Sequence, residues 1–471
     1  MNTFFKNISI YGVLPLVGRF IGFFLVPVYA RVFSSAEYGQ VQLVIALVNF
    51  LVYFISLEFY TSIGRYFYDR PEMAGKRTLV STGLWMTVMS AALVVILCLV
   101  FQDAFLRYYL DDTALRGVLL AGVAWLGLDG ISAYLNVIPR YTDRAKAYVI
   151  INACAIFVRA ASTIVYVLVL DTGIAGVLYG HMTGTALAII SNIILSRRYL
   201  GFTFSVKDSR LIFNYAILLM PGVIITALWV PTVRKAIEDI FSVSIVGQFA
   251  MAASITSLAT MFKSALMNAW RPLLFERRND PAFFGEVRRN SSTVAFVILA
   301  LSCFLTLFSY EICLIIGTEE FVHSMVFIPF LCMVGYLQAV TQLRGFGPLI
   351  TDHTYVDSLV ALLSYAVGLG FLLSAGTRLG LFGIGIAIVL YELVYYVVLY
   401  RYTLVKIRDF CTSLIVRSEY FVLALFIVCG VVAMLHAPLA VRIAVGVALL
   451  VTLLHVNARH YHILTKIKVS A

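Results

Sequence analysis

The sequence predicts an all-α polytopic membrane protein with about fourteen transmembrane helices. Two observations on composition lead to this: 62% of the 471 residues are hydrophobic and only 13% are charged, with a mean hydropathy of +0.96. Soluble domains carry about a quarter charged residues, which cover the surface that faces water. A chain with so few charges needs lipid as the solvent for most of its surface, so a soluble protein is excluded.

The third observation is the recurrence of apolar runs of about 20 residues, the length that crosses about 30 Å of hydrocarbon. Charged breaks or breaks with Gly or Pro separate the runs, and the N-terminal run has no signal-peptide cleavage site. The breaks at Asp171-Thr172-Gly173 and Ala437-Pro438 are short, so twelve spans result if one of these pairs does not cross. The predicted spans are 9–30, 41–66, 78–101, 114–139, 147–170, 173–196, 211–231, 243–268, 292–316, 324–343, 357–375, 379–400, 419–436 and 439–458.

The orientation follows from the basic residues. Most of the 35 Lys and Arg lie in alternate loops and in the tail, and cytoplasmic loops are enriched in these residues. This distribution predicts that both termini lie in the cytoplasm. It also accounts for the net charge of +11 without a nucleic acid partner.

The loops are short, and the longest is the basic stretch Trp270–Ser291. None contains a DxD motif, a P-loop, an HExxH motif or a Gly-rich phosphate cradle. No cysteine lies at metal-binding spacing from another cysteine or a histidine. The sequence therefore predicts no enzyme activity, no metal and no cofactor.

An internal repeat relates the first and seventh predicted spans. At an offset of 204 residues, and then of 208 after four extra residues, the matches are Tyr11 with Tyr215, Gly18 with Gly222, Val26-Pro27 with Val230-Pro231, Arg31 with Lys235, and Gly39-Gln40 with Gly247-Gln248. Six spans separate the copies, so both have the same orientation and the repeat is parallel.

The repeat predicts two six-helix bundles, 1–205 and 206–410, related by a pseudo-two-fold axis along the membrane normal. Residues 411–471 add two helices and a cytoplasmic tail. A cavity between two such bundles is typical of an alternating-access transporter. Pro27, Pro231 and Pro221-Gly222 are expected to loosen spans one and seven.

Ionisable residues inside spans cost about 2.5–3.5 kcal/mol each, so they usually face a bundle interior or an aqueous cavity. One interpretation is a cationic cavity for a diphosphate headgroup, lined by Arg19, Arg65, Arg159 and Lys263. The alternative is internal pairing, of Asp129 with Arg159 and of Glu58 with Arg65.

Three carboxylates are candidates for a coupling proton or sodium ion: Glu58, Asp129 and Glu392. A carboxylate in a low dielectric readily takes up a proton, but the sequence does not choose among the three. Glu311 is expected at a membrane interface, and His181 is expected to be a packed helix residue.

Aromatic clusters lie near predicted span boundaries, as in Tyr66-Phe67-Tyr68 and Tyr395-Tyr396. Interfacial anchoring explains such clusters. Stacking on sugar rings is the alternative for those members that face a cavity.

The opening NISIYGVLPLVGRFIGFFLVPVYARVFSSAEYGQVQL and the following FISLEFYTSIGRYFYD resemble the start of Wzx-type polysaccharide-biosynthesis flippases. These belong to the superfamily that also holds multidrug and lipid II transporters. The stretch VGQFAMAASITSLATMFKSALMNAWRPLLF resembles the second-half copy in that family.

The resemblance implies export of an undecaprenyl-diphosphate-linked oligosaccharide, such as an O-antigen precursor, to the outer leaflet. It implies membrane lipids and other polysaccharide assembly proteins as partners. In lipid II-flipping relatives, cations of the first, second and eighth helices line the cavity, and Arg19, Arg65 and Lys263 lie in the corresponding spans. The chain departs from the family at Glu58, where the second-span motif usually has glycine.

Two other functions are weighed against export of a lipid-linked oligosaccharide. A cation-coupled multidrug exporter would have the same fold, but cavity cations repel cationic drugs. A membrane oligosaccharide polymerase or ligase needs a large periplasmic catalytic loop, and every predicted loop on that side is short.

Overall fold

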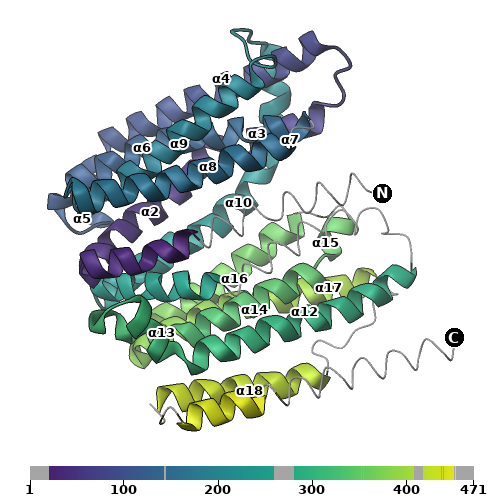
Figure 1. Cartoon of the computed structure of the whole chain (residues 1–471). Coiled ribbons are helices and arrows are strands. Elements are labelled where there is room, and N and C mark those ends of the chain that lie inside the picture. Colours follow the sequence, from purple (N-terminus) through teal and green to yellow (C-terminus); the bar gives the residue numbers. More distant parts are fainter. Residues whose placement is uncertain are drawn as a thin grey trace. The chain divides into compact units, whose positions relative to one another are not determined.

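The computed structural model describes residues 21–142, 145–258, 281–351, 353, 355–407, 417–435, 438, 440–449 and 451, and every regular element in these ranges is helical (Figure 1). The chain divides into two compact units, Met1–Ala250 and Met251–Ala471. These units follow packing, whereas the boundaries predicted at 205 and 410 follow the repeat and stay a prediction.

Unit 1 holds the helices up to the start of the eighth predicted span. They are Ile21–Val32, α2 (Ser35–Ser56), α3 (Phe59–Tyr66), α4 (Met73–Val100), α5 (Gln102–Tyr108), η1 (Thr113–Leu115), α6 (Arg116–Leu135), α7 (Ile138–Tyr141), α8 (Ala145–Ile164), the π-helical η2 (Val165–Val169), α9 (Ala175–Ser196), α10 (Val206–Ile240) and the first turns of the helix Val243–Leu258.

Unit 2 holds the helices of the remaining predicted spans. They are α12 (Pro281–Leu307), α13 (Ser309–Ile316), η3 (Glu319–Val326), α14 (Ile328–Arg344), α15 (Gly347–Ile350), α16 (Tyr355–Ser374), η4 (Gly376–Leu379), α17 (Leu381–Lys406), α18 (Arg417–Met434) and the helix Ala440–Leu449.

Each of the fourteen predicted spans contains a helix in the described residues. Eight helices are long and apolar enough to cross a membrane by themselves. Two further spans are bent pairs, by 70° between α12 and α13 and by 47° between η3 and α14, and four shorter apolar helices fall in spans one, eight, thirteen and fourteen. The short break after Asp171 is a turn, with left-handed backbone at Asp171 and Gly173.

The second predicted span is not continuous. The chain leaves α2 at Ser56 and starts α3 at Phe59, and Leu57 and Glu58 between them have φ of 41° and 56°. Side chains with a Cβ pay about 1–2 kcal/mol in this left-handed region. The expected single helix over 41–66 is therefore wrong at this point. Glycine at position 58 would adopt this backbone without strain.

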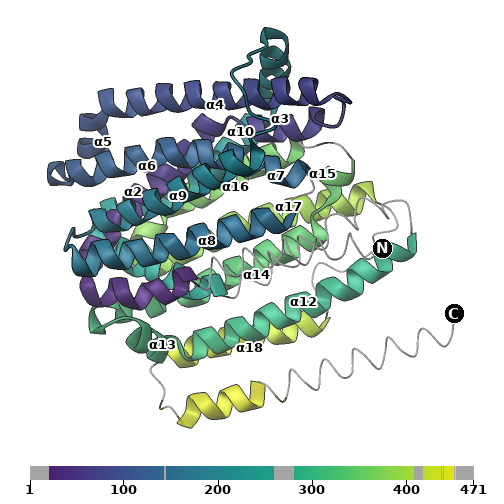
Figure 2. The same ribbon diagram turned by 45° about the horizontal axis from the view of Figure 1, so that its top comes forward.

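Small residues let α8 and α9 approach closely. Gly180 and Gly184 lie one turn apart on the buried face of α9. A Cβ at Gly184 would lie 2.7 Å from the carbonyl oxygen of Ala155, and one at Gly180 would overlap the side chain of Thr163. Such small-residue faces are the usual means of packing helices in lipid, where burial of apolar surface no longer drives association. α6, α8 and α9 lie side by side (Figures 1 and 2).

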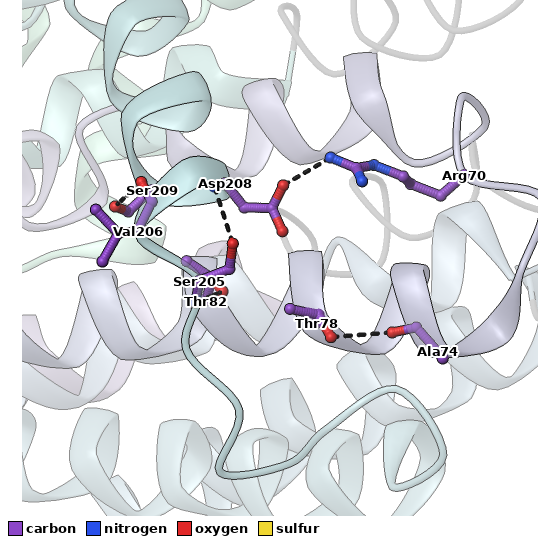
Figure 3. A network of polar contacts seen from close by, with 8 residues as sticks. All are labelled: Arg70, Ala74, Thr78, Thr82, Ser205, Val206, Asp208 and Ser209. Carbon is purple, nitrogen blue, oxygen red and sulfur yellow. Dashed lines mark hydrogen bonds and ion pairs between the residues drawn. The ribbon is translucent and has the colours of Figure 1, made fainter.

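Helix α10 runs for 35 residues with Pro221 and Pro231 inside it. Polar contacts hold its N-terminus to the segment between α3 and α4 and to α4 itself (Figure 3). Ser205 caps the helix by accepting from the N–H of Asp208 at 3.2 Å, and the Asp208 carboxylate pairs with Arg70 at 2.6 Å. Thr82 of α4 accepts from the N–H of Ser205 at 3.0 Å. The start of the second repeat is thus anchored within unit 1.

The helix Val243–Leu258 crosses α2 at the glycines that the repeat aligns. A Cβ on Gly39 would overlap the carbonyl oxygen of Val243, and a Cβ on Gly247 would overlap that of Ser35. Each such Cβ would also lie 3.0 Å from the backbone nitrogen of the other glycine. Because Val243 follows Ser35 at the same offset of 208 residues as Gly247 follows Gly39, the contact is reciprocal. This reciprocity agrees with the predicted repeat, whose parallel symmetry stays a prediction.

In unit 2, two residues near predicted span ends are bound within the protein. Arg344, expected in a loop, is the last residue of α14 and is fully buried. Glu311 of α13, expected at an interface, pairs at 2.8 Å with Arg442 of the helix Ala440–Leu449. This ion pair joins the ninth span to the last one.

Candidate functional site

A group of polar side chains lies deep among the helices of unit 1, and we call it the polar cluster. Its members come from the helix Ile21–Val32, from α6, from α8 and from α9. They are Tyr29, Trp125, Asp129, Arg159, Thr163 and His181.

The charges of the polar cluster face each other without closing an ion pair. The Arg159 guanidinium interacts electrostatically with Asp129 and with the Tyr29 hydroxyl. In the described part of the chain no ion pair within 4.0 Å joins Arg159 to a carboxylate. Asp129 and Arg159 are therefore neighbours, as the predicted alternative of pairing implies, but they do not form an ion pair.

Two polar atoms of the cluster, Arg159 Nε and His181 Nδ1, are buried and lack a hydrogen-bond partner. Trp125 lies within reach of the Asp129 carboxylate, and Thr163 lies within reach of the Tyr29 hydroxyl. The His181 ring lies against Trp125, with ring centroids 4.4 Å apart. Buried polar groups are almost always hydrogen-bonded, and a partly satisfied network is costly in a low dielectric. A site of this kind can change its hydrogen bonding when Asp129 gains or loses a cation.

Glu58 has a different environment. Its carboxylate is buried and accepts hydrogen bonds from Tyr60 Oη at 2.7 Å and from Thr61 Oγ1 at 2.6 Å. The predicted alternative pairing with Arg65 does not form, because Arg65 pairs with Asp69 at 3.4 Å instead. The hydrogen bonds to the Glu58 carboxylate thus come from the first turn of α3.

Glu392, the third carboxylate, lies in unit 2. It is buried on α17 and accepts a hydrogen bond of 2.6 Å from Gln338 Nε2 of α14. The Gln338 amide is thus a neutral donor to this carboxylate.

The predicted cationic set is only partly described. Arg19 and Lys263 lie outside the described residues, Arg159 is in the polar cluster, and Arg65 is at the end of α3 with 59% of its side chain exposed. The two described cations, Arg65 and Arg159, lie at different places in unit 1, and the cationic cavity stays a prediction.

Sequence reasoning missed Tyr29, Trp125 and Thr163, because uncharged polar residues carry no strong insertion penalty. Their spacing was a usable signal: Trp125 and Asp129 are four residues apart, as are Arg159 and Thr163, and such pairs share a helix face. The approach of α6, α8 and α9 could not be read from that spacing. Within the described residues, no group of His, Cys, Asp and Glu could hold a metal ion.

Comparison with known proteins gives one family and one fold. The family described as polysaccharide biosynthesis protein matches residues 4–277. An uncharacterized membrane protein of Haemophilus influenzae is 23% identical over 382 residues, which cover 76% of this chain and 90% of that protein.

Among solved structures, the lipid II flippase MurJ in an inward closed conformation has a TM-score of 0.73 at 14% identity, covering 96% of this chain and 99% of MurJ. An inward-facing multidrug resistance MATE transporter of the MOP superfamily has a TM-score of 0.64 at 14% identity, covering 85% and 95%. A MOP superfamily transporter from Pyrococcus furiosus, described as having a binding pocket of reverse polarity, has a TM-score of 0.56 at 14% identity, covering 87% and 97%.

Proposed function

Because this chain belongs to the polysaccharide biosynthesis protein family, we propose that it is a flippase for a polyprenyl-diphosphate-linked oligosaccharide. It would move this lipid from the cytoplasmic to the outer leaflet of the inner membrane for cell-surface polysaccharide biosynthesis. The family match over residues 4–277 carries this proposal, and the shared fold with a lipid II flippase supports it. Both termini would lie in the cytoplasm, as the positive-inside rule predicts.

The fold supports transport by alternating access. The reciprocal crossing at Gly39 and Gly247 supports a repeat, and in parallel-repeat transporters two bundles rock about a central site. In this proposal Arg19, Arg65, Arg159 and Lys263 replace water around the diphosphate during the crossing. Guanidinium groups suit this task because they bind phosphate oxygens in a bidentate manner.

The polar cluster is our proposed site of coupling to a proton or sodium gradient. Among the three candidate carboxylates, Glu58 has two hydroxyl donors and Glu392 has an amide donor. Asp129 has Trp125 beside it and, unlike the other two, also faces a cation that forms no ion pair within 4.0 Å. Uptake of a proton by Asp129 would release Arg159, and its loss would attract Arg159 again.

Depletion of the protein tests the transport function. The expected result is accumulation of a lipid-linked oligosaccharide in the inner membrane and loss of surface polysaccharide, both restored by the wild-type gene. Mass spectrometry of the extracted lipid identifies the cargo and its sugars. Unchanged surface polysaccharide without precursor accumulation would refute the proposal.

A multidrug exporter is the second candidate, favoured by the similarity to MATE transporters. It predicts that depletion sensitises cells to cationic drugs and leaves the polysaccharide unchanged. Measurement of both phenotypes in the same depleted strain separates the two candidates.

A further inference from the structure

Aromatic side chains from four separate segments meet at the end of unit 1 that carries α3 and α7. They belong to α3 and the turn after it, to α7, to the turn after α9 and to α10. We call this group the aromatic cluster: Tyr66, Phe67, Tyr68, Tyr141, Tyr199 and Tyr215.

The cluster differs from a row of interfacial anchors, because its rings pack on each other. Phe67 is buried at its centre, with ring centroids 6.0 Å from Tyr141 and 5.8 Å from Tyr199. Gly64 leaves the space that the Tyr141 hydroxyl occupies, since a Cβ there would overlap it. Anchors project singly toward headgroups, whereas these rings are organised around α3.

Two tyrosines form the partly exposed side of the aromatic cluster. Tyr66 of α3 and Tyr215 of α10 make an edge-to-face pair with centroids 5.9 Å apart. Both are half-buried, and neither hydroxyl has a hydrogen-bond partner among the described residues. The pair therefore offers ring faces and two free hydroxyls at one place.

A cation and a carboxylate stand beside this pair. The Arg65 guanidinium lies over the Tyr66 ring, 5.7 Å from its centroid, and 59% of its side chain is exposed. Asp69, 57% exposed, lies 3.4 Å from Arg65. Aromatic faces, free hydroxyls, a carboxylate and a guanidinium are together the groups that bind a sugar joined to a phosphate.

We propose that Tyr66, Tyr215, Arg65 and Asp69 form a subsite for the first sugars of the cargo; this rests on the proposed flippase function. The apolar C–H face of a sugar ring would stack on the electron-rich face of a tyrosine. The tyrosine hydroxyls and Asp69 would bond to sugar hydroxyls. Arg65 would bind the neighbouring phosphate, to which its planar fork is suited.

Binding to full-length purified protein tests the subsite with two probes. One is undecaprenyl diphosphate, and the other is the lipid-linked oligosaccharide extracted from depleted cells. We expect Tyr66→Ala and Tyr215→Ala each to weaken binding of the glycosylated lipid about fivefold to tenfold and to leave binding of undecaprenyl diphosphate unchanged. Arg65→Gln should weaken both.

Conservative variants and a matched control separate recognition from folding. Tyr66→Trp keeps a stacking face and should retain binding of the glycosylated lipid, and Tyr66→Phe should lose less than Tyr66→Ala. Tyr108, on α5, is 79% exposed, so Tyr108→Ala should bind both probes like wild type. Equal binding of the glycosylated lipid by Tyr66→Ala, Tyr215→Ala and Tyr108→Ala would overturn the subsite.

An anionic lipid headgroup is the other source of a phosphate for Arg65. If phosphatidylglycerol vesicles compete with the glycosylated lipid, and Tyr66→Ala does not alter this competition, the sugar subsite is refuted. Failure of the proposed function looks different: depleted cells would then accumulate no lipid-linked oligosaccharide at all. Accumulation of the precursor, with tyrosine variants that bind it normally, would refute the subsite alone.

Discussion

The crossing of α2 with the helix Val243–Leu258 and the polar cluster are two interior regions of unit 1 with opposite physical character. At the crossing, two glycines bring backbone against backbone, and Ser35 and Ser244 close it with a 2.5 Å hydrogen bond. In the polar cluster, buried nitrogen atoms of Arg159 and His181 lack hydrogen-bond partners. In lipid, close packing stabilises helix pairs, while unsatisfied polar groups cost free energy and usually mark function.

The contrast teaches which interior features of this chain serve the fold and which serve transport. Glu392 provides a third case, since it is buried and polar but has a donor. A residue that serves the fold should affect abundance and export together. A residue that serves transport should affect export even when stability and abundance are restored.

The largest effect is expected at the crossing. Gly39→Ala places a Cβ against the carbonyl oxygen of Val243, and neither helix can yield without moving backbone, so we expect a loss of about 3 kcal/mol in stability and a low yield of folded protein. Gly117→Ala on α6 is the matched control, since a Cβ there meets nothing within 4 Å. Thermal unfolding in detergent compares the two, and equal unfolding temperatures would show that the crossing is not tightly packed.

The next effect is expected in the polar cluster. Asp129→Asn and Arg159→Gln should each abolish export, and each leaves one buried charge without its counterpart, at a cost of up to about 3 kcal/mol. The double variant removes both charges, so its stability and abundance should recover while export stays absent. Full export by the double variant would show that the two charges serve the fold only.

A smaller effect is expected for Glu392→Gln. The variant keeps an acceptor oxygen for Gln338 Nε2, so stability should fall by about 1 kcal/mol or less and export should remain near wild type. Surface polysaccharide and protein abundance are measured together. Loss of export at normal abundance would place the coupling site in unit 2 and reverse the comparison.

The smallest effect is expected at the break between α2 and α3. Glu58→Gly relieves the left-handed strain but removes the acceptor for Tyr60 and Thr61, so the two changes offset each other. Glu58→Ala removes the acceptor and keeps the strain, so it should be about 1 kcal/mol less stable than Glu58→Gly. If both variants unfold alike, backbone strain at this position is negligible.

Much of the fold could be predicted because lipid imposes a length and a composition on each span. The repeat was also readable, because Gly39 and Gly247 lie at a close approach that excludes a side chain. The break at Leu57-Glu58 was missed, since an apolar run of the right length does not reveal two left-handed residues within it. Pro221 and Pro231 were noticed, but the sequence did not show that α10 continues through both.

For the candidate site, the sequence identified the charged residues inside spans. The tertiary structure showed that these residues have different partners. Composition alone determined a membrane protein, and the basic residues and repeat determined its predicted orientation and symmetry, because these depend on residue type and spacing. Whether Glu58, Asp129 or Glu392 has a donor depends on which residues face it. Gln338 is 54 residues from Glu392, and Arg159 and His181 reach the neighbourhood of Asp129 only because α6, α8 and α9 pack together.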